Sequence, residues 1–439
     1  MGKRKAIQRV ALAAAVALGA SACLSDSGGS SSGGSSGTKS GDGNVEIVFG
    51  FGGSQSKGFQ GAFTEWEKTS GIKIKWTEAS QSFDTLIRTR VQANNVPDIA
   101  LFPQPGILKD FVAQNKMTDL STQLDVSSLQ SQLVSGVLDA GKVGDKYYGV
   151  PISYNVKSLV FYPKKAWATA GYKVPTTQAE LTTLTNQIKS SGTTPWCLGI
   201  ESGSATGWPA TDWLEDEVLR TGGPETYDKW VSHQIPFNDP AIKTAATAFQ
   251  DLVLADGNVL GGRKGATSTN FATAGNPMFN AKPGCMMLKQ GNFITQSGFF
   301  PKNVVADIDN EVGVFYFPGQ DANTKPVLGG GDLAAVFNGK DDDTKKVMAF
   351  MTGPDFPGWK DSDAFLSPRK DYDVSKYSSN LTRQIADIGK NTTTFRFDAS
   401  DSMPGAVGSG SFWKGMTAWI SGQQSLDQAL TSIEQSWPS

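Results

Sequence analysis

The stretch VEIVFGFGGS, residues 45–54, is the part of the sequence that most directly indicates the fold. Its first five residues, rich in β-branched and aromatic side chains, are typical of a short strand. The glycines that follow turn the chain away from this strand. Phe59, Phe63 and Trp66 then recur at helical spacing and predict a helix over 59–68. A strand, a turn and a helix in this order begin an α/β layer.

The same alternation continues along the chain. Further strands are predicted over 72–77 and 98–102, with a helix over 83–94 between them. Strands that alternate with helices imply an α/β layer structure with a largely parallel sheet. Beyond residue 150 the pattern predicts longer helices over 178–190, 213–220 and 240–255, strands over 312–317 and 333–337, and closing helices over 412–421 and 426–437.

The first residues predict the compartment. A basic leader precedes a short apolar run, residues 10–18, and three small residues then lead to Cys23. This order is typical of a secretory signal peptide over 1–22, and a cysteine directly after the small residues is what lipoprotein processing modifies. Residues 23–43 are almost entirely Ser and Gly after the cysteine, which predicts a flexible tether. We therefore expect a protein outside the cytoplasm, held to the outer face of the cell membrane by a lipid on Cys23.

Composition argues against several classes of function. The 439-residue chain has a formal net charge of −2, and its basic residues are dispersed, so the sequence contains no basic stripe that could bind a nucleic-acid backbone. Its single histidine, His233, argues against a Ser-His-Asp triad, a Cys-His pair or a two-histidine metal site. We expect no catalytic residue, metal or cofactor. Cys197 and Cys285, in an oxidising compartment, are expected to pair.

Two enzymatic alternatives stay open at the level of residues. Residues 54–57 and 153–155 match two of the three motifs of penicillin-recognising enzymes, but the late K-T-G strand is missing. Asp212 and Glu215 share a helix face beside Trp208, which suits a glycoside hydrolase or a sugar-binding pocket equally. Aromatic residues near polar ones collectively suit a carbohydrate cleft: Trp208, Trp213, Phe293, Phe395, Phe412 and Trp413.

Several short motifs, in order along the chain, carry a family resemblance. They are VPDIA at 96–100, YYGVP at 147–151, SLVFY at 158–162, PWC at 195–197, TGWPATDW at 206–213 and KQGNF at 289–293. Together they resemble the extracellular solute-binding proteins of carbohydrate ABC importers, the family of maltose-binding protein, and within it the α-glucoside-binding lipoproteins. The resemblance runs from about Val45 to Trp437 and is most specific in the stretch 206–213.

The resemblance implies a two-lobed periplasmic-binding-protein-like fold of type II. Strands that cross between the two α/β lobes would form the hinge, and a sugar would bind in the cleft between the lobes. The first lobe would comprise residues 44–153 and 313–364, and the second lobe residues 154–312 and 365–439.

The resemblance also implies site residues. It places Gly52 to Ser54 in the first strand-to-helix turn and Gln104 among the groups that bind hydroxyls, with Tyr154 and Asn155 at the first crossing strand. Trp208 and Trp413 match stacking rings, and Phe293 stands where the family usually has Trp. The full predicted ligand-binding set is Gly52, Ser54, Gln104, Tyr154, Asn155, Trp208, Asp212, Asn292, Phe293, Gly330, Asp332 and Trp413.

The function implied by the resemblance is capture without chemistry. A monomer would bind an α-linked disaccharide or oligosaccharide, such as an α-glucoside, and hand it to the transmembrane subunits of an ABC permease. The alternative that we carry is a secreted glycoside hydrolase.

Overall fold

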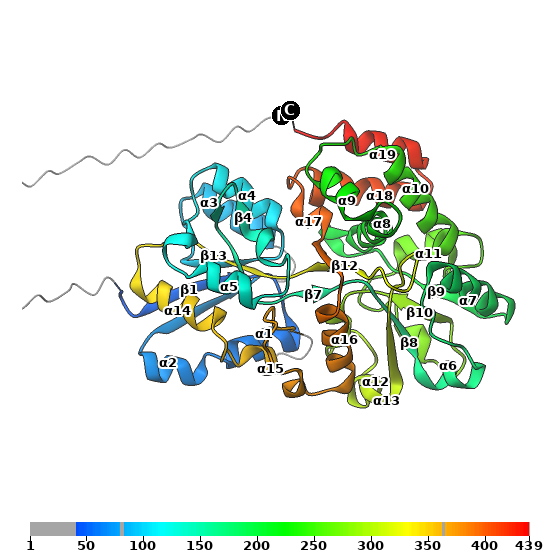
Figure 1. Ribbon diagram of the computed structural model, residues 1–439, viewed down its shortest axis with the longest axis horizontal. Helices are drawn as coiled ribbons and strands as arrows, with labels where there is room; N and C mark the ends of the chain where they lie inside the picture. Colours follow the sequence, from blue (N-terminus) through cyan, green and yellow to red (C-terminus); the bar gives the residue numbers. More distant parts are fainter. Residues whose placement is uncertain (1–40, 80–82, 362–364, 439) are drawn as a thin grey trace, which may run out of the picture. The chain divides into compact units, whose positions relative to one another are not determined.

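The computed structural model describes residues 41–79, 83–361 and 365–438 (Figure 1). The predicted signal peptide, Cys23 and the tether up to residue 40 lie outside the described residues. At the end of the tether, the Gly43 amide donates a hydrogen bond of 2.9 Å to the Asp343 carboxylate. Within the described part of the chain, no helix is long and apolar enough to cross a membrane.

The first sheet has five strands in the order β2-β1-β3-β13-β6. Strand β1 runs parallel to β2 and β3, as predicted, whereas β13 runs antiparallel to both β3 and β6. Strands β2, β1, β3 and β6 therefore share one direction, so this sheet is largely parallel, as expected, and of its five strands only β13 is reversed. The reason is that β13 is not reached through a helical crossover of the kind that parallel strands need. The strands are β1 (Asn44–Phe49), β2 (Lys73–Glu78), β3 (Ile99–Phe102), β6 (Val150–Pro151) and β13 (Leu333–Val336).

Helices alternate with and follow the strands of this first sheet along the chain. The single helix predicted over 59–68 is two helices, α1 and α2, because the chain leaves helical pairing after Gly61 and restarts at Thr64. Phe59 and Phe63 are nonetheless fully buried, as the spacing predicted. The elements of this half are α1 (Gly53–Gly61), α2 (Thr64–Ser70), α3 (Phe83–Gln92), α4 (Pro105–Ala113), α5 (Val126–Gln132), α14 (Asp342–Thr352), α15 (Gly358–Asp361) and the hairpin of β4 (Lys142–Val143) and β5 (Lys146–Tyr147).

The second sheet has four strands in the order β11-β8-β10-β9. Strand β11 pairs with β8, so residues 313–316, which the sequence prediction placed in the first lobe, belong to the second sheet. A disulfide joins Cys197 at the end of β9 to Cys285 at the start of β10, the pair that the sequence predicted. The strands are β8 (Leu159–Pro163), β9 (Thr194–Cys197), β10 (Cys285–Lys289) and β11 (Val312–Tyr316).

Most of the helices belong with this second sheet. The helix predicted over 178–190 is α7 at the same bounds, while the one predicted over 213–220 begins earlier, at Trp208. The helices are α6 (Lys164–Ala170), α7 (Gln178–Ser190), α8 (Trp208–Thr221), α9 (Gly223–Val231), α10 (Pro240–Phe249), α11 (Gly262–Ser268), α12 (Lys302–Ala306), α13 (Ile308–Glu311), α16 (Asn380–Lys390), α17 (Ala399–Ser402), α18 (Trp413–Ser421) and α19 (Leu426–Glu434).

Single turns complete the chain. The 3₁₀ turns are η1 (Leu120–Thr122), η2 (Leu138–Gly141), η3 (Gly203–Ala205), η5 (Asn276–Phe279), η6 (Asn292–Thr295) and η7 (Val374–Lys376), and the π-helical turns are η4 (Gln250–Leu254) and η8 (Val407–Phe412).

Three further strands lie where the chain passes between the two halves. They form a separate sheet in the order β14-β12-β7, in which β12 is parallel to β14 and antiparallel to β7. Along the chain, β7 leads from β6 of the first sheet to β8 of the second, and β12 leads back from β11 to β13, whereas β14 joins α16 to α17 (Figure 1). The strands are β7 (Asn155–Val156), β12 (Pro326–Gly330) and β14 (Thr394–Phe397). They provide the hinge strands of a two-lobed α/β fold.

Candidate functional site

The start of α8 places Trp208 at the first residue of a helix. The preceding residue, Gly207, has a φ of 114°, and a Cβ atom there would lie 2.2 Å from the carbonyl oxygen of Trp413. Only glycine meets both demands. The half-buried indole of Trp208 donates a 3.1 Å hydrogen bond to the Ser202 hydroxyl. Its ring centroid lies 5.9 Å from that of Phe293, so two of the predicted stacking positions are neighbours.

Asp212 lies one helical turn beyond Trp208 and on the same face of α8. It is 4 % exposed, and its carboxylate accepts a 3.1 Å hydrogen bond from the Lys157 ammonium. That ammonium also forms an ion pair with Asp398 and lies 5.6 Å from the centre of the Trp208 ring. Lys157 therefore joins a proposed stacking ring to two buried carboxylates.

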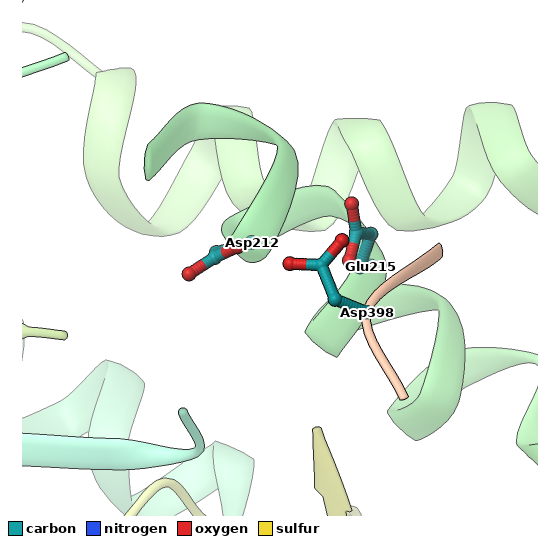
Figure 2. Close-up of side chains that lie close together, drawn as sticks. All are labelled: Asp212, Glu215 and Asp398. Carbon is teal, nitrogen blue, oxygen red and sulfur yellow. The ribbon is translucent and has the colours of Figure 1, made fainter. Parts of the chain in front are cut away.

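Three carboxylates gather at this point, as Figure 2 shows for Asp212, Glu215 and Asp398. Single oxygens of the three lie within 4.8 Å of one another, a spacing at which carboxylates can hold a metal ion. Here the Lys157 ammonium forms ion pairs with both Asp212 and Asp398. The third carboxylate, Glu215, accepts backbone hydrogen bonds of 2.9 and 3.1 Å from residues 399 and 400. A lysine and backbone amides thus supply hydrogen-bond partners to all three carboxylates.

Burial and charge shift the pKa values of the cluster in different directions. Burial raises the pKa of Asp212 to about 8, although the nearby Lys157 charge opposes it. Burial, with the charges of Asp398 and Asp212, likewise raises the pKa of Glu215 well above its usual range. For Asp398 burial acts the same way, but the Lys157 charge and the side-chain hydrogen bonds from Asp212, Glu215 and Lys157 together outweigh it and lower the pKa. The cluster therefore retains protons at neutral pH, which limits its buried negative charge.

A carboxyl group with a raised pKa is also what a glycosidase needs as its general acid. In this structure the two candidates, Asp212 and Glu215, both bind other groups of the protein. Glu215 is fully buried, with both oxygens on backbone amides, and Asp212 faces Lys157. Neither carboxyl group has the open position beside a sugar bond that protonation of a leaving group requires. Asp212 and Glu215, the pair that supported the hydrolase alternative, therefore make contacts within the protein instead of facing a substrate.

Trp413 belongs to the same cluster. Its half-buried indole donates to the Ser400 hydroxyl over 3.4 Å, and that hydroxyl donates to the Asp398 carboxylate over 2.8 Å. The Thr211 hydroxyl, on α8 beside Asp212, also donates to Ser400 over 3.2 Å. Two predicted stacking rings are thus attached to Asp398, one through Lys157 and one through Ser400.

Two polar members of the predicted set in the first half of the molecule contact residues of the second half. The Ser54 hydroxyl, in α1, donates to the Gln296 side chain over 3.4 Å. Gln104, directly before α4, hydrogen-bonds the Asp401 carboxylate of α17 with its side chain. Seven members of the predicted set are partly exposed: Gly52, Ser54, Gln104, Asn155, Trp208, Phe293 and Trp413.

The other five predicted residues are buried: Tyr154, Asp212, Asn292, Gly330 and Asp332. The Tyr154 ring packs against Phe395 at 6.2 Å, and the Asn292 side chain accepts a 2.8 Å hydrogen bond from the Val156 amide. Gly330 pairs with Asn155 in the hinge sheet. Asp332 accepts a 2.9 Å hydrogen bond from Ser153, and burial raises its pKa to about 6. Tyr154, Asn292, Gly330 and Asp332 therefore lie in or against the hinge strands, whereas Asp212 lies in α8.

Sequence reasoning missed Lys157, Asp398 and Ser400. One signal was available for Lys157, because it interrupts the strand-like run of residues 155–162. A charged residue inside such a run is rarely buried unless it is paired. Asp398 and Ser400 carry no comparable signal, since short polar residues are ordinary after a strand.

Two lobes, three hinge strands and half-buried rings beside polar groups define the class as a ligand-binding receptor. Residues 52–356 match the family of bacterial extracellular solute-binding proteins. The chain belongs to this family, as the resemblance predicted, and is a binding protein rather than an enzyme.

Known relatives extend over nearly the whole chain. The osmoprotective compounds-binding protein GgtB of Synechocystis sp. is 38 % identical over 388 residues, 88 % of this chain and 90 % of that protein. The alpha-glucosides-binding periplasmic protein AglE of Rhizobium meliloti is 36 % identical over 411 residues, 90 % of this chain and 88 % of that protein. The fold is similar to that of the bacterial solute receptor AcbH, with a TM-score of 0.75 at 17 % identity, covering 89 % of this chain and 97 % of that one.

Proposed function

We propose that this protein captures an α-linked disaccharide or oligosaccharide, an α-glucoside or similar sugar, and delivers it to the transmembrane subunits of an ABC permease. The observation that carries the proposal is the pair of half-buried indoles, Trp208 and Trp413, on one polar network. Aromatic rings suit the apolar faces of pyranoses. Partly exposed Gln104, Asn155 and Ser54 suit the hydroxyl groups around those faces.

The relatives support the class of ligand. The name of AglE states α-glucosides, and that of GgtB states osmoprotective compounds. Identity of more than a third over most of both chains makes a similar ligand the first to test in this protein.

Capture would proceed by hinge closure. The lobes that we propose follow the sequence prediction, except that residues 313–316 go with the second lobe because β11 pairs with β8. Bending at β7 and β12, the strands that pass between the two sheets, would bring the lobes together around the sugar. Closure is favoured only to the extent that the ligand binds the closed form better than the open form. The closed monomer would then dock on the permease.

We also propose that the protein is anchored outside the cytoplasm by a lipid on Cys23. The proposal rests on the leader and the cysteine in residues 1–23 and on the extracellular character of the family. The Ser- and Gly-rich tether would separate the anchor from the body, so that anchoring and binding are independent.

The proposal is tested by calorimetry with purified protein that begins at residue 41. We expect binding to at least one of trehalose, sucrose and maltose, no binding to the β-linked control cellobiose, and recovery of the sugar unchanged by chromatography. Absence of binding to all three α-linked sugars would refute the α-glucoside assignment. Steady release of monosaccharide that Asp212→Asn abolishes would instead establish the glycoside hydrolase.

A further inference from the structure

The three hinge strands meet at a single ion pair. Lys157 directly follows β7, and Asp398 directly follows β14. The Asp398 amide donates a 2.7 Å hydrogen bond to the Gly329 carbonyl of β12. At Gly330, the last residue of β12, a Cβ atom would lie 3.4 Å from the Lys157 side chain. Rotation of any of these three strands would therefore change the distance or the angle between Lys157 and Asp398.

The same ion pair contacts both rings of the proposed sugar site, Trp208 directly and Trp413 through Ser400. On one side the Lys157 ammonium lies over Trp208 and binds Asp212 of the same helix. On the other side Asp398 accepts from Ser400, to which the Trp413 indole donates. Each step is a contact between a buried polar group and its partner, so a shift at the hinge is transmitted to the rings without passing through solvent.

We propose that Lys157 and Asp398 are positioning residues that couple the rings of Trp208 and Trp413 to the hinge strands, so that ligand contact with the rings and lobe closure favour each other. The proposal rests on the proposed function, because it assigns a ligand to the rings. It adds a link between binding and closure that neither the rings nor the strands supply alone. Coupling of this kind is reciprocal, so weakening the link lowers both ligand affinity and ligand-induced closure.

The test must remove the link without leaving a buried charge unpaired. Lys157 is 7 % exposed and Asp398 is 1 % exposed, and loss of one partner alone would strand the other in the interior. The double variant Lys157→Met/Asp398→Asn removes both charges and keeps side chains of similar size. Asp212, which also pairs with Lys157, holds a proton at neutral pH in this variant, because burial raises its pKa to about 8 even beside the lysine. The asparagine at position 398 can still accept from Ser400, so the Trp413 side of the network is retained.

The chain offers a matched control. Arg90 of α3 and Glu46 of β1 form a largely buried ion pair of 2.8 Å in the first half of the molecule. Neither residue belongs to the predicted ligand-binding set or to the hinge strands. The double variant Arg90→Met/Glu46→Gln therefore removes an ion pair of the same charges away from the rings and the hinge strands.

Three readouts decide the proposal, with trehalose, sucrose and maltose as probes. Affinity from calorimetry should fall about two- to thirty-fold in the hinge pair, the range found for residues that modulate coupling. Compaction on adding sugar, from small-angle X-ray scattering, should shrink in the same variant. Added to Trp208→Ala, the hinge pair should weaken binding by less than it does in the parent, because the two changes break one chain of contacts.

The control pair should leave affinity and compaction unchanged. Wild-type affinity and compaction in the hinge pair, an equal loss in the control pair, or full additivity with Trp208→Ala would each overturn the proposal. Should the hinge pair fail to fold, Lys157→Arg keeps the charge but not the geometry, and wild-type binding and compaction in that variant would overturn the proposal. If the parent protein binds none of the probes, the proposed function fails instead, which separates the two failures.

Discussion

Replacing Trp208 by alanine is the most direct test of the sugar site. The indole is half-buried, donates one hydrogen bond to Ser202, and contacts Phe271 at 4.8 Å and Phe293 at 5.9 Å between ring centroids. It therefore has some packing to lose, but part of its surface already meets solvent. Trp213, five residues along the same helix, is 1 % exposed and stacks on Phe249 with centroids 5.2 Å apart.

These environments predict opposite results for the two variants. A ring that lies on a pyranose contributes about 1.5 to 3 kcal/mol by burial of apolar surface. Loss of the Trp208 ring should therefore weaken binding about ten- to two-hundred-fold. Truncation of a fully packed tryptophan costs about 3 to 5 kcal/mol of stability. We expect that cost in Trp213→Ala and a smaller one in Trp208→Ala.

Differential scanning calorimetry with and without sugar separates the two effects. Trp208→Ala should melt close to the parent without sugar and gain little on adding the sugar that stabilises the parent, because less ligand is bound. Trp213→Ala should melt well below the parent, and any folded fraction should keep the parent affinity. A Trp208→Ala protein that binds as tightly as the parent would remove this ring from the site.

Three further results are expected. Cys23→Ser should move the protein from the membrane fraction to the soluble fraction without changing sugar affinity; continued membrane association of the variant would contradict the lipid anchor. Replacing both Cys197 and Cys285 by alanine should lower the free energy of unfolding in urea by about 2 to 4 kcal/mol, since the bridge closes a loop with a sequence separation of 88; an unchanged unfolding curve would show that the bridge adds no stability. Burial raises the pKa of Asp332 to about 6, so the folded state keeps a proton that the unfolded state releases, and this contribution to stability, at most about 3 kcal/mol, is lost as pH rises from about 4 to 6. Melting temperatures at pH 4 and 7 should show that fall in the parent and not in Asp332→Asn, and an equal fall in both would exclude this carboxyl group as its source.

Local patterns were sufficient for much of the fold. The helix over 178–190 and the strands near 45–49 and 312–317 appear within a residue or so of their predicted bounds, because one side of each is apolar at the period of its element. What the periodicity does not encode is strand direction. The antiparallel entry of β13 follows from a chain that crosses between lobes and returns, a long-range property with no local period.

The partly exposed residues of the proposed site could be named from the sequence, whereas the contacts that connect them could not. Trp208 and Trp413 could be named because aromatic rings beside small polar residues are typical of carbohydrate sites. The contact between them runs through Ser400 and Asp398, which lie far along the chain from Trp208. Only the packing of α8 against α17 brings these residues together, and no spacing within one segment carries that information.

Stability alone does not explain why a lysine occupies the junction of the hinge strands. Taking Lys157 and its two carboxylates out of water costs several kcal/mol per ion, and apolar groups of similar size are often at least as stabilising. Apolar side chains at this junction would, however, favour no particular orientation of the strands, because hydrophobic contact is not directional. Hydrogen bonds from one ammonium to Asp212 and Asp398 are directional, and they weaken steeply when the angle changes. A junction of this kind favours particular relative positions of β7, β14 and α8, which is the property that a protein with an open and a closed form requires of its hinge.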